Sequence, residues 1–170
     1  MRSGLAIAAL SLAALASTGC GGGGNDKTVD SSKVEQGIKD DLSSSSGEVT
    51  SAKCPDDVKL EKGADFNCSV TFANGSTGKV EVTQTGATTF SYDLVPGSVH
   101  VPGATAEKEI QKDLARQGIP NATVNCPDDI VVKSGTTVTC DVSGAKGAGK
   151  VTFSFSREDG TVDPGSVKIS

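Results

Sequence analysis

The sequence predicts two homologous α+β domains, each with an N-terminal amphipathic helix packed on one face of an antiparallel β-sheet. Three observations support this fold class: a long internal repeat, an apolar stripe of helical period at the start of each copy, and period-two alternation after it. Such alternation leaves one apolar sheet face, and the helix is the only element available to cover that face.

Residues 1–19 are predicted to be a signal peptide, because Arg2 precedes an apolar run from Leu5 to Ala16. The run is shorter than the roughly 20 apolar residues that span a membrane. The ending "STGC" resembles the lipobox of bacterial lipoproteins, although Ser17 stands where that motif usually has an aliphatic residue. The resemblance implies a lipidated Cys20 and a protein anchored on the extracytoplasmic face of the cell membrane. Cleavage after "ALA" at 14–16 would instead give a secreted protein with Cys20 as an odd free thiol.

Residues 20–29 are predicted to be the lipidated cysteine and a flexible glycine-rich tether. The chain is acidic, with 16 Lys and Arg against 21 Asp and Glu. Binding to nucleic acid or to anionic lipid headgroups needs a basic face, so both are excluded as partners. The lipid at Cys20 is therefore the expected contact with the membrane.

The internal repeat has an offset of 72 residues, which carries Cys54 onto Cys126 and Cys68 onto Cys140. Its register slips only in glycine-rich segments, as expected when insertions fall in loops. We predict a first repeat domain over residues 30–99 and a second over 100–170, with a linker near "VPGSVHVPGAT".

Each repeat begins with a predicted helix. In "DSSKVEQGIKDDL" the apolar stripe recurs every four residues, and Asp30 or Ser31 is available as the N-cap. In "TAEKEIQKDLARQG" the stripe recurs in the same way, with Thr105 as the cap and Gly118 as the stop. Gly37 weakens the first helix by about 1 kcal/mol relative to alanine.

Alternating segments after each helix are predicted to be strands. "DFNCSVTF" at 65–72 and "TVTCDV" at 137–142 alternate apolar and polar residues. Further strands are expected around Val80 and Val82, around Phe90 to Leu94, and around Val151 to Phe155.

A domain this small, in a chain with no Trp and one Tyr, needs a covalent staple. Four cysteines remain after Cys20, and they allow three pairings. The repeat favours Cys54 with Cys68 and Cys126 with Cys140, because each bond then closes within its own copy.

The leading helix, the "CP" with acidic residues, and the second cysteine in a "TVTCDV"-like strand resemble domain of unknown function 4333. The resemblance covers both repeats, from Val34 to Thr83 and from Ala106 to Phe155, and is in keeping with a lipoprotein of actinobacterial type. It implies a small α+β domain without an established activity.

The repeated "CPDD" is interpreted as a half-cystine followed by a turn before strands at Val58 and Ile130. We considered three alternatives: a redox centre, a shared zinc site, and calcium at the Asp-Asp pairs. Cysteine spacing disfavours the first two, and too few alternating ligands disfavour the third. The single histidine, His100, is read as a linker residue, so we expect no enzyme, no catalytic residue, no metal site and no cofactor.

Two functions of different class remain. The favoured one is a non-enzymatic cell-envelope lipoprotein whose polar sheet faces bind an envelope protein or a cell-wall polymer. The alternatives are a spacer without a specific ligand, or a weak divalent-cation-binding surface protein. The repeats differ in charge, with 6 basic and 11 acidic residues over 28–99 against 8 and 9 over 100–170.

Overall fold

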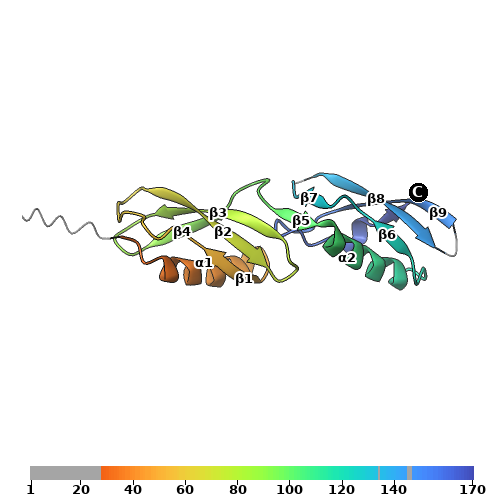
Figure 1. Cartoon of the computed structure of the whole chain (residues 1–170), viewed down its shortest axis with the longest axis horizontal. Coiled ribbons are helices and arrows are strands. Elements are labelled where there is room, and N and C mark those ends of the chain that lie inside the picture. The colour runs from red at the N-terminus through yellow and green to blue at the C-terminus, as the bar shows by residue number, and fades with distance from the viewer. Residues whose placement is uncertain (1–27, 134, 145–146) are drawn as a thin grey trace, which may run out of the picture.

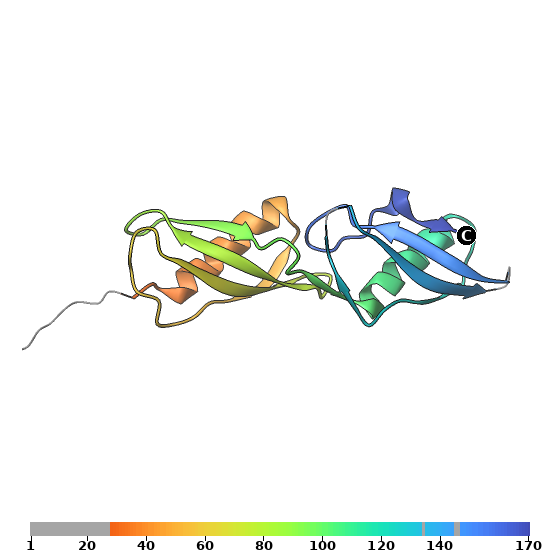
Figure 2. The same cartoon turned by 90° about the horizontal axis from the view of Figure 1, so that it is seen from above.

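The computed structural model describes residues 28–133, 135–144 and 147–170. The expected signal peptide, Cys20 and most of the tether lie outside these residues. Two α+β domains follow one another along an elongated molecule, with both helices on one side and both sheets on the other (Figure 1). Seen from above, the strands of each domain lie over its helix (Figure 2). The expected fold class is confirmed.

The first domain packs one helix against four antiparallel strands. The apolar stripe of Val34, Ile38 and Leu42 is buried against the sheet. The alternating segment forms a strand whose Cys68, Val70 and Phe72 face the helix. The elements are α1 (Ser31–Ser45), β1 (Val49–Lys53), β2 (Asp65–Phe72), β3 (Thr77–Gln84) and β4 (Phe90–Leu94), with strand order β1-β2-β3-β4.

The second domain repeats this plan with a shorter final strand. Ala106, Ile110 and Leu114 form the buried stripe of its helix. The sheet has the order β10-β9-β8-β6, and a 3₁₀ turn precedes its last strand. The elements are α2 (Gly103–Arg116), β6 (Thr123–Asn125), β8 (Thr137–Gly144), β9 (Gly147–Ser154), η1 (Pro164–Ser166) and β10 (Lys168–Ile169).

The segment predicted to be a linker is instead an ordered strand, β5 (His100–Pro102). It pairs with β3 of the first domain through Thr77 and with β7 (Asp129–Val131) of the second domain. Val99 and Val101 flank His100 and are 2% and 0% exposed. The alternation of buried valines around one exposed residue is that of a strand, so the segment that joins the two domains has regular secondary structure.

The first domain begins with the equivalent pairing, in the form of a single β-bridge. Thr28 forms an antiparallel bridge with Lys59, and the Val29 amide donates to the Val58 carbonyl at 2.8 Å. Thr28 lies 72 residues before His100, so this pairing is copied with the rest of the repeat. β5 therefore opens the second domain while it still contacts the sheet of the first.

Thr105 does not cap the second helix, because that helix already begins at Gly103. The Gly103 amide donates to the Asp128 carbonyl at 2.8 Å, which fixes the chain at the end of β5. Ser31, where α1 begins, lies 72 residues earlier, so both helices start at the same repeat position. Thr105 lies inside the first turn, and its hydroxyl contacts the first domain instead.

Gly37 has a packing role that explains a glycine inside a helix. A Cβ at this position would lie 2.2 Å from Tyr92 Oη and 2.8 Å from Tyr92 Cζ. The tyrosine on β4 therefore lies against the bare helix backbone. Its pKa is raised by burial and, to a lesser extent, by the negative charge of Asp41.

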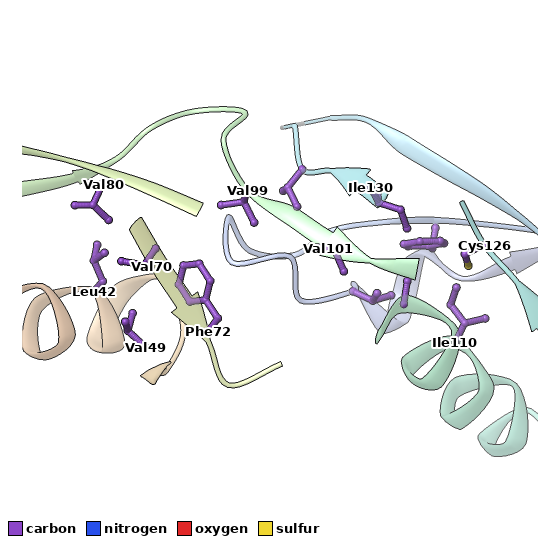
Figure 3. Packing of buried hydrophobic residues seen from close by; sticks show 14 of the residues in the cluster. Leu42, Val49, Val70, Phe72, Val80, Val99, Val101, Ile110, Cys126 and Ile130 are labelled. Atoms are coloured by element: carbon purple, nitrogen blue, oxygen red, sulfur yellow. The ribbon is translucent and has the colours of Figure 1, made fainter. Parts of the chain in front are cut away.

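The two cores meet at the junction and form one contiguous apolar cluster. In Figure 3, Val99 lies between Phe72 of the first core and Val101 of the second. Each core holds one fully buried phenylalanine, Phe72 on β2 and Phe153 on β9. These two phenylalanines do not occupy matching repeat positions, so the cores share a plan and differ in their packing.

Candidate functional site

Both CPDD segments are structural turns that begin at a disulfide. Cys54 is bonded to Cys68 and Cys126 to Cys140, each across 14 residues and with Cα atoms 4.4 Å apart. The four cysteines are therefore oxidised in the pairing that the repeat favours, and none is a free thiol. These bonds tie the segment after each first edge strand to the central strand of the sheet.

One glutamate of each helix holds the CPDD turn, and the sequence analysis did not identify it. Glu35 Oε1 accepts a hydrogen bond from the Cys54 amide, and Glu107 Oε1 accepts one from the Cys126 amide, both at 3.0 Å. The two glutamates are 72 residues apart, so their shared position was a visible signal. A charged acceptor on a partly buried amide connects helix, turn and disulfide.

The aspartates of CPDD have different partners in the two copies. Asp56 Oδ1 accepts a hydrogen bond from Ser31 Oγ at 3.0 Å, at the start of α1. Asp129 Oδ2 lies 2.8 Å from His100 Nδ1, on the neighbouring strand. His100 is therefore paired, but both side chains are about half exposed, at 46% and 62%. Such an exposed pair contributes little to stability.

A joint between the domains is built by the β2–β3 turn and the loop after β9. Ser76 Oγ donates to the Asp159 carbonyl at 2.5 Å, and Asn74 Nδ2 donates to the same oxygen at 3.2 Å. Thr105 Oγ1 donates to the Asn74 carbonyl at 3.0 Å. Ser76 is fully buried, so water is excluded from its bond to the Asp159 carbonyl, while the two bonds of Asn74 are partly buried.

Glycines allow the close approach at this joint. A Cβ on Gly47 would lie 1.9 Å from Asp159 Oδ2, and a Cβ on Gly160 would lie 2.2 Å from Val101 Cγ2. Gly160 also has φ +84, which favours glycine. The joint is thus a close-packed contact with defined hydrogen bonds.

Each domain has an open sheet face opposite its helix. The first open face has a basic row, with Ser69 opposite both Lys53 and Lys79. Glu81 lies directly opposite Asp93, an unfavourable like-charge pair. The exposed residues of this face are Lys53, Asp65, Asn67, Ser69, Thr77, Lys79, Glu81 and Asp93.

The second open face is rich in hydroxyl groups and nearly neutral. Its Asp141 and Lys150 are paired at 2.8 Å. Glu81 of the first face is replaced by Thr152 in the second, at the offset of 71 that follows the one-residue slip. The exposed residues of this face are Thr123, Asn125, Thr137, Thr139, Asp141, Ser143 and Lys150.

A shallow hollow of about 500 Å³ lies at the end of the first open face next to the joint. Its polar lining includes Ser69, Thr77, Lys79, Ser98 and His100. The hollow is therefore lined by hydroxyl groups and by one ammonium group, that of Lys79, which suits a polar or hydroxyl-rich ligand.

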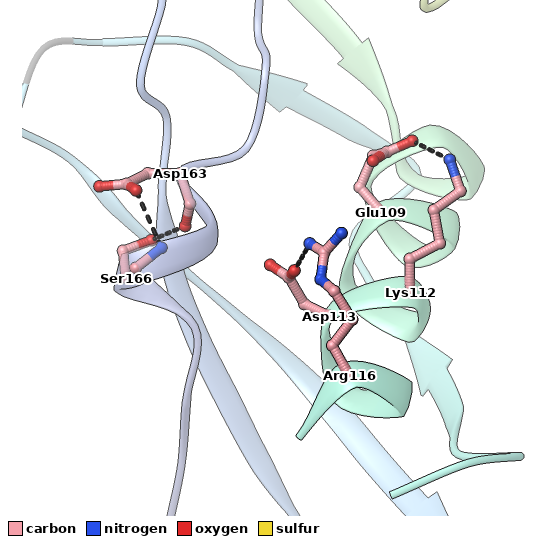
Figure 4. Close-up of polar contacts among 7 residues, drawn as sticks. Glu109, Lys112, Asp113, Arg116, Asp163 and Ser166 are labelled. Atoms are coloured by element: carbon pink, nitrogen blue, oxygen red, sulfur yellow. Dashed lines mark hydrogen bonds and ion pairs between the residues drawn. The ribbon is translucent and has the colours of Figure 1, made fainter. Parts of the chain in front are cut away.

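Other polar clusters have local structural roles. Asp113 is buried on α2 and pairs with the exposed Arg116 one turn later, while Lys112 pairs with Glu109 at 2.7 Å (Figure 4). Asp163 caps the 3₁₀ turn by accepting the Gly165 amide. Over residues 28–170, apart from the gaps at 134 and 145–146, no three His, Cys, Asp or Glu side chains are grouped to hold a metal ion.

Comparison with known families identifies the repeats. The sequence matches the family described as Domain of unknown function (DUF4333) over residues 11–89 and again over residues 86–160. The chain belongs to this family. It contains two DUF4333 copies, as the cysteine, helix and strand motifs indicated. No curated protein and no solved structure matches it.

Within the described part of the chain, neither helix has the length and apolar character that crossing a membrane requires. Cys20, the expected lipidation site, lies outside the described residues, so its modification stays a prediction. Of the site residues proposed from the sequence, the four remaining cysteines are brought together in pairs.

Proposed function

We propose that this tandem DUF4333 protein is a non-enzymatic lipoprotein of the cell envelope, whose two open sheet faces together bind an envelope protein or a cell-wall polymer. The observation that carries the proposal is the common orientation of the two domains. Both sheets lie on one side of the molecule and both helices on the other (Figure 1).

The joint supports a combined binding surface. The shared strand β5, the buried Ser76 hydroxyl and the contiguous core oppose rotation of one domain against the other. Two weak sites held in a fixed arrangement gain affinity from effective concentration when the ligand matches their spacing. An extended partner would therefore be bound along both faces at once.

The binding proposal is tested by capture from an envelope extract with the full chain. Charge reversal at equivalent positions of the open faces, Lys79→Glu with Lys150→Glu, should reduce capture at least tenfold. Lys33→Glu with Lys108→Glu makes the same charge change on exposed helix positions and should leave capture unchanged. Equal loss in both variants would show that net charge, and no specific face, controls capture.

A spacer without a specific ligand is the second candidate, and the different charges of the two faces favour it. A repetitive ligand should select similar faces, whereas the like-charge pair of Glu81 and Asp93 has no counterpart in the second face, where Thr152 takes the position of Glu81. Absence of any reproducible captured partner would support the spacer. A spacer would also tolerate the face variants without any change in its envelope role.

The anchor is tested separately with Cys20→Ala in the full chain. Loss of the lipidated cysteine should release the protein into the medium, because the described helices offer no alternative membrane span. Membrane and medium fractions are compared by immunoblot. Retention of Cys20→Ala in the membrane fraction would contradict the lipoprotein proposal without affecting the face experiment.

A further inference from the structure

We propose that the joint carries a second, distinct binding site: a pocket for the C-terminal residue of an extended peptide, with an aliphatic side chain and a free carboxylate. The site does not depend on the open-face proposal, because Lys133, Phe155 and Arg157 lie on neither open face, although the turn at 95–97 also borders the hollow beside the joint. It also lies between the two folded domains, because residues 94–97 end and follow β4 of the first domain and the other lining residues belong to the second.

Three segments that are far apart in the sequence meet around this pocket. The first domain contributes the end of β4 and the following turn, and the second contributes the segment after β7 and the loop after β9. The pocket has a volume of about 180 Å³. The segments that line it are 94–97, 132–133 and 155–158.

The pocket is too small for a whole drug-sized ligand, which needs roughly 300–1,000 Å³. Its apolar lining comes from Leu94, Val95, Pro96, Val132 and Phe155. A volume of about 180 Å³ with such walls suits one compact aliphatic group. The rest of the ligand would have to lie outside, as it does when a terminal residue is bound.

The rim of the pocket is basic in a protein with a net charge of −5. Lys133 and Arg157 are exposed, and neither side chain has an ion-pair partner among the described residues. Lys133 Cε lies 4.0 Å from the position of a Cβ on Gly97, so its aliphatic stem lies over the turn. Glu158 is the one acidic residue of the lining, which leaves a net positive rim.

An apolar floor next to two cations matches a terminal carboxylate beside an aliphatic side chain. Arginine binds carboxylates in a bidentate geometry, and lysine adds a point charge. Capture of a C-terminal carboxylate is a recurring mode of peptide recognition.

The test uses the full-length protein, labelled with ¹⁵N, and two peptides. Acetyl-Ala-Leu with a free carboxylate should shift the amide signals of Gly97, Val132 and Phe155. Its C-terminal amide should bind at least tenfold more weakly, because it lacks the charge. Lys133→Gln with Arg157→Gln should weaken binding of the free acid at least fivefold, and the matched surface variant Lys108→Gln should change it less than twofold.

Ser76→Ala with Asn74→Ala tests whether the pocket depends on the joint. Loosening the joint should weaken binding of the free acid at least threefold, while the signals of each domain core stay in place. Equal binding of acid and amide, or no shift of the three pocket amides up to 10 mM peptide, would overturn the proposal. Equal binding of inorganic phosphate would reduce the pocket to a general anion site and would also overturn it.

Discussion

The two domains share the contacts that are made within one repeat, and they differ in the residues through which they contact each other. The helix stripe, the disulfide and the glutamate on the half-cystine amide all recur at an offset of 72. Asn74 and Ser76 of the first domain and Asp159 of the second make the joint, and they come from different positions of the repeat. The contacts within each unit are therefore common to both copies, whereas the contacts of the joint come from loops that differ between the copies.

The final strand shows the same contrast. In the first domain β4 pairs with β3 over five positions before the Pro-Gly-Ser turn. In the second domain the corresponding turn comes earlier, directly after the bridge between Phe155 and Val162. The first domain therefore has Tyr92 of β4 against its helix, whereas the sheet of the second domain ends with the two-residue strand β10, which pairs with β9.

Removal of a disulfide should have the largest effect and should be equal in the two domains. Both bonds close loops of the same length, so Cys54→Ser with Cys68→Ser and Cys126→Ser with Cys140→Ser should each lower the free energy of unfolding by about 3 kcal/mol. Urea denaturation followed by circular dichroism measures both. A clear difference between the two losses of unfolding free energy would show that one domain depends more on its disulfide. A bridge between Cys54 and Cys126 in non-reducing peptide maps would refute the two-module pairing.

Truncation of the shared glutamate should cost less. Glu35→Ala and Glu107→Ala each leave a partly buried cysteine amide without its charged acceptor, which should lower the free energy of unfolding by about 2 kcal/mol. Glu→Gln at the same positions keeps an acceptor oxygen and should restore most of the loss. If the alanine variants unfold like the unmutated chain in urea, the contact is not a stabilising part of the module.

The joint should contribute less to the free energy of unfolding, but its loss should also change the number of unfolding transitions. Ser76→Ala removes the hydroxyl that bonds the Asp159 carbonyl and also lies 2.6 Å from Asn74 Oδ1, and one such buried hydrogen bond is worth about 1 kcal/mol. Because the bond links two domains, its loss should reduce their cooperativity, and calorimetry should resolve two transitions where the unmutated chain shows one. Ser44→Ala, on the exposed end of α1, is the matched control. Two separate transitions in the unmutated chain would show that the domains unfold independently.

The smallest effect is a pH dependence confined to the first domain. Because burial raises the pKa of Tyr92 above 10.0, the unfolded chain loses this proton first as the pH rises. The contribution is present below pH 10 and is lost as the pH passes the folded-state pKa. Tyr92 is the single tyrosine, so ultraviolet titration should report a midpoint above 10.0 that Tyr92→Phe abolishes. A midpoint at or below 10.0 would mean that the ring is exposed.

Local pattern predicted much of each domain. The apolar stripe with a four-residue period predicted α1 and α2, and the period-two alternation predicted β2 and β8. The shared offset of the cysteines predicted the pairing that both disulfides have. The edge strands β1 and β6 were missed, because each is short and carries little alternation. Thr105 was assigned to a cap because it precedes the apolar stripe, although Ser31 and Gly103 mark the shared helix start.

The sequence by itself determined the repeat, its helices, its central strands and its cysteine pairing, since these follow from short-range periodicity and from comparison of one copy with the other. Tertiary structure alone decided the joint, the shared strand β5 and the pocket beside it. These depend on contacts such as Ser76 to Asp159, across 83 residues, which no local pattern encodes. Val99 and Val101 are buried where the two cores meet, so the segment between the domains is an ordered strand, β5. Because β5 pairs with strands of both domains, it fixes how the two sheet faces are oriented.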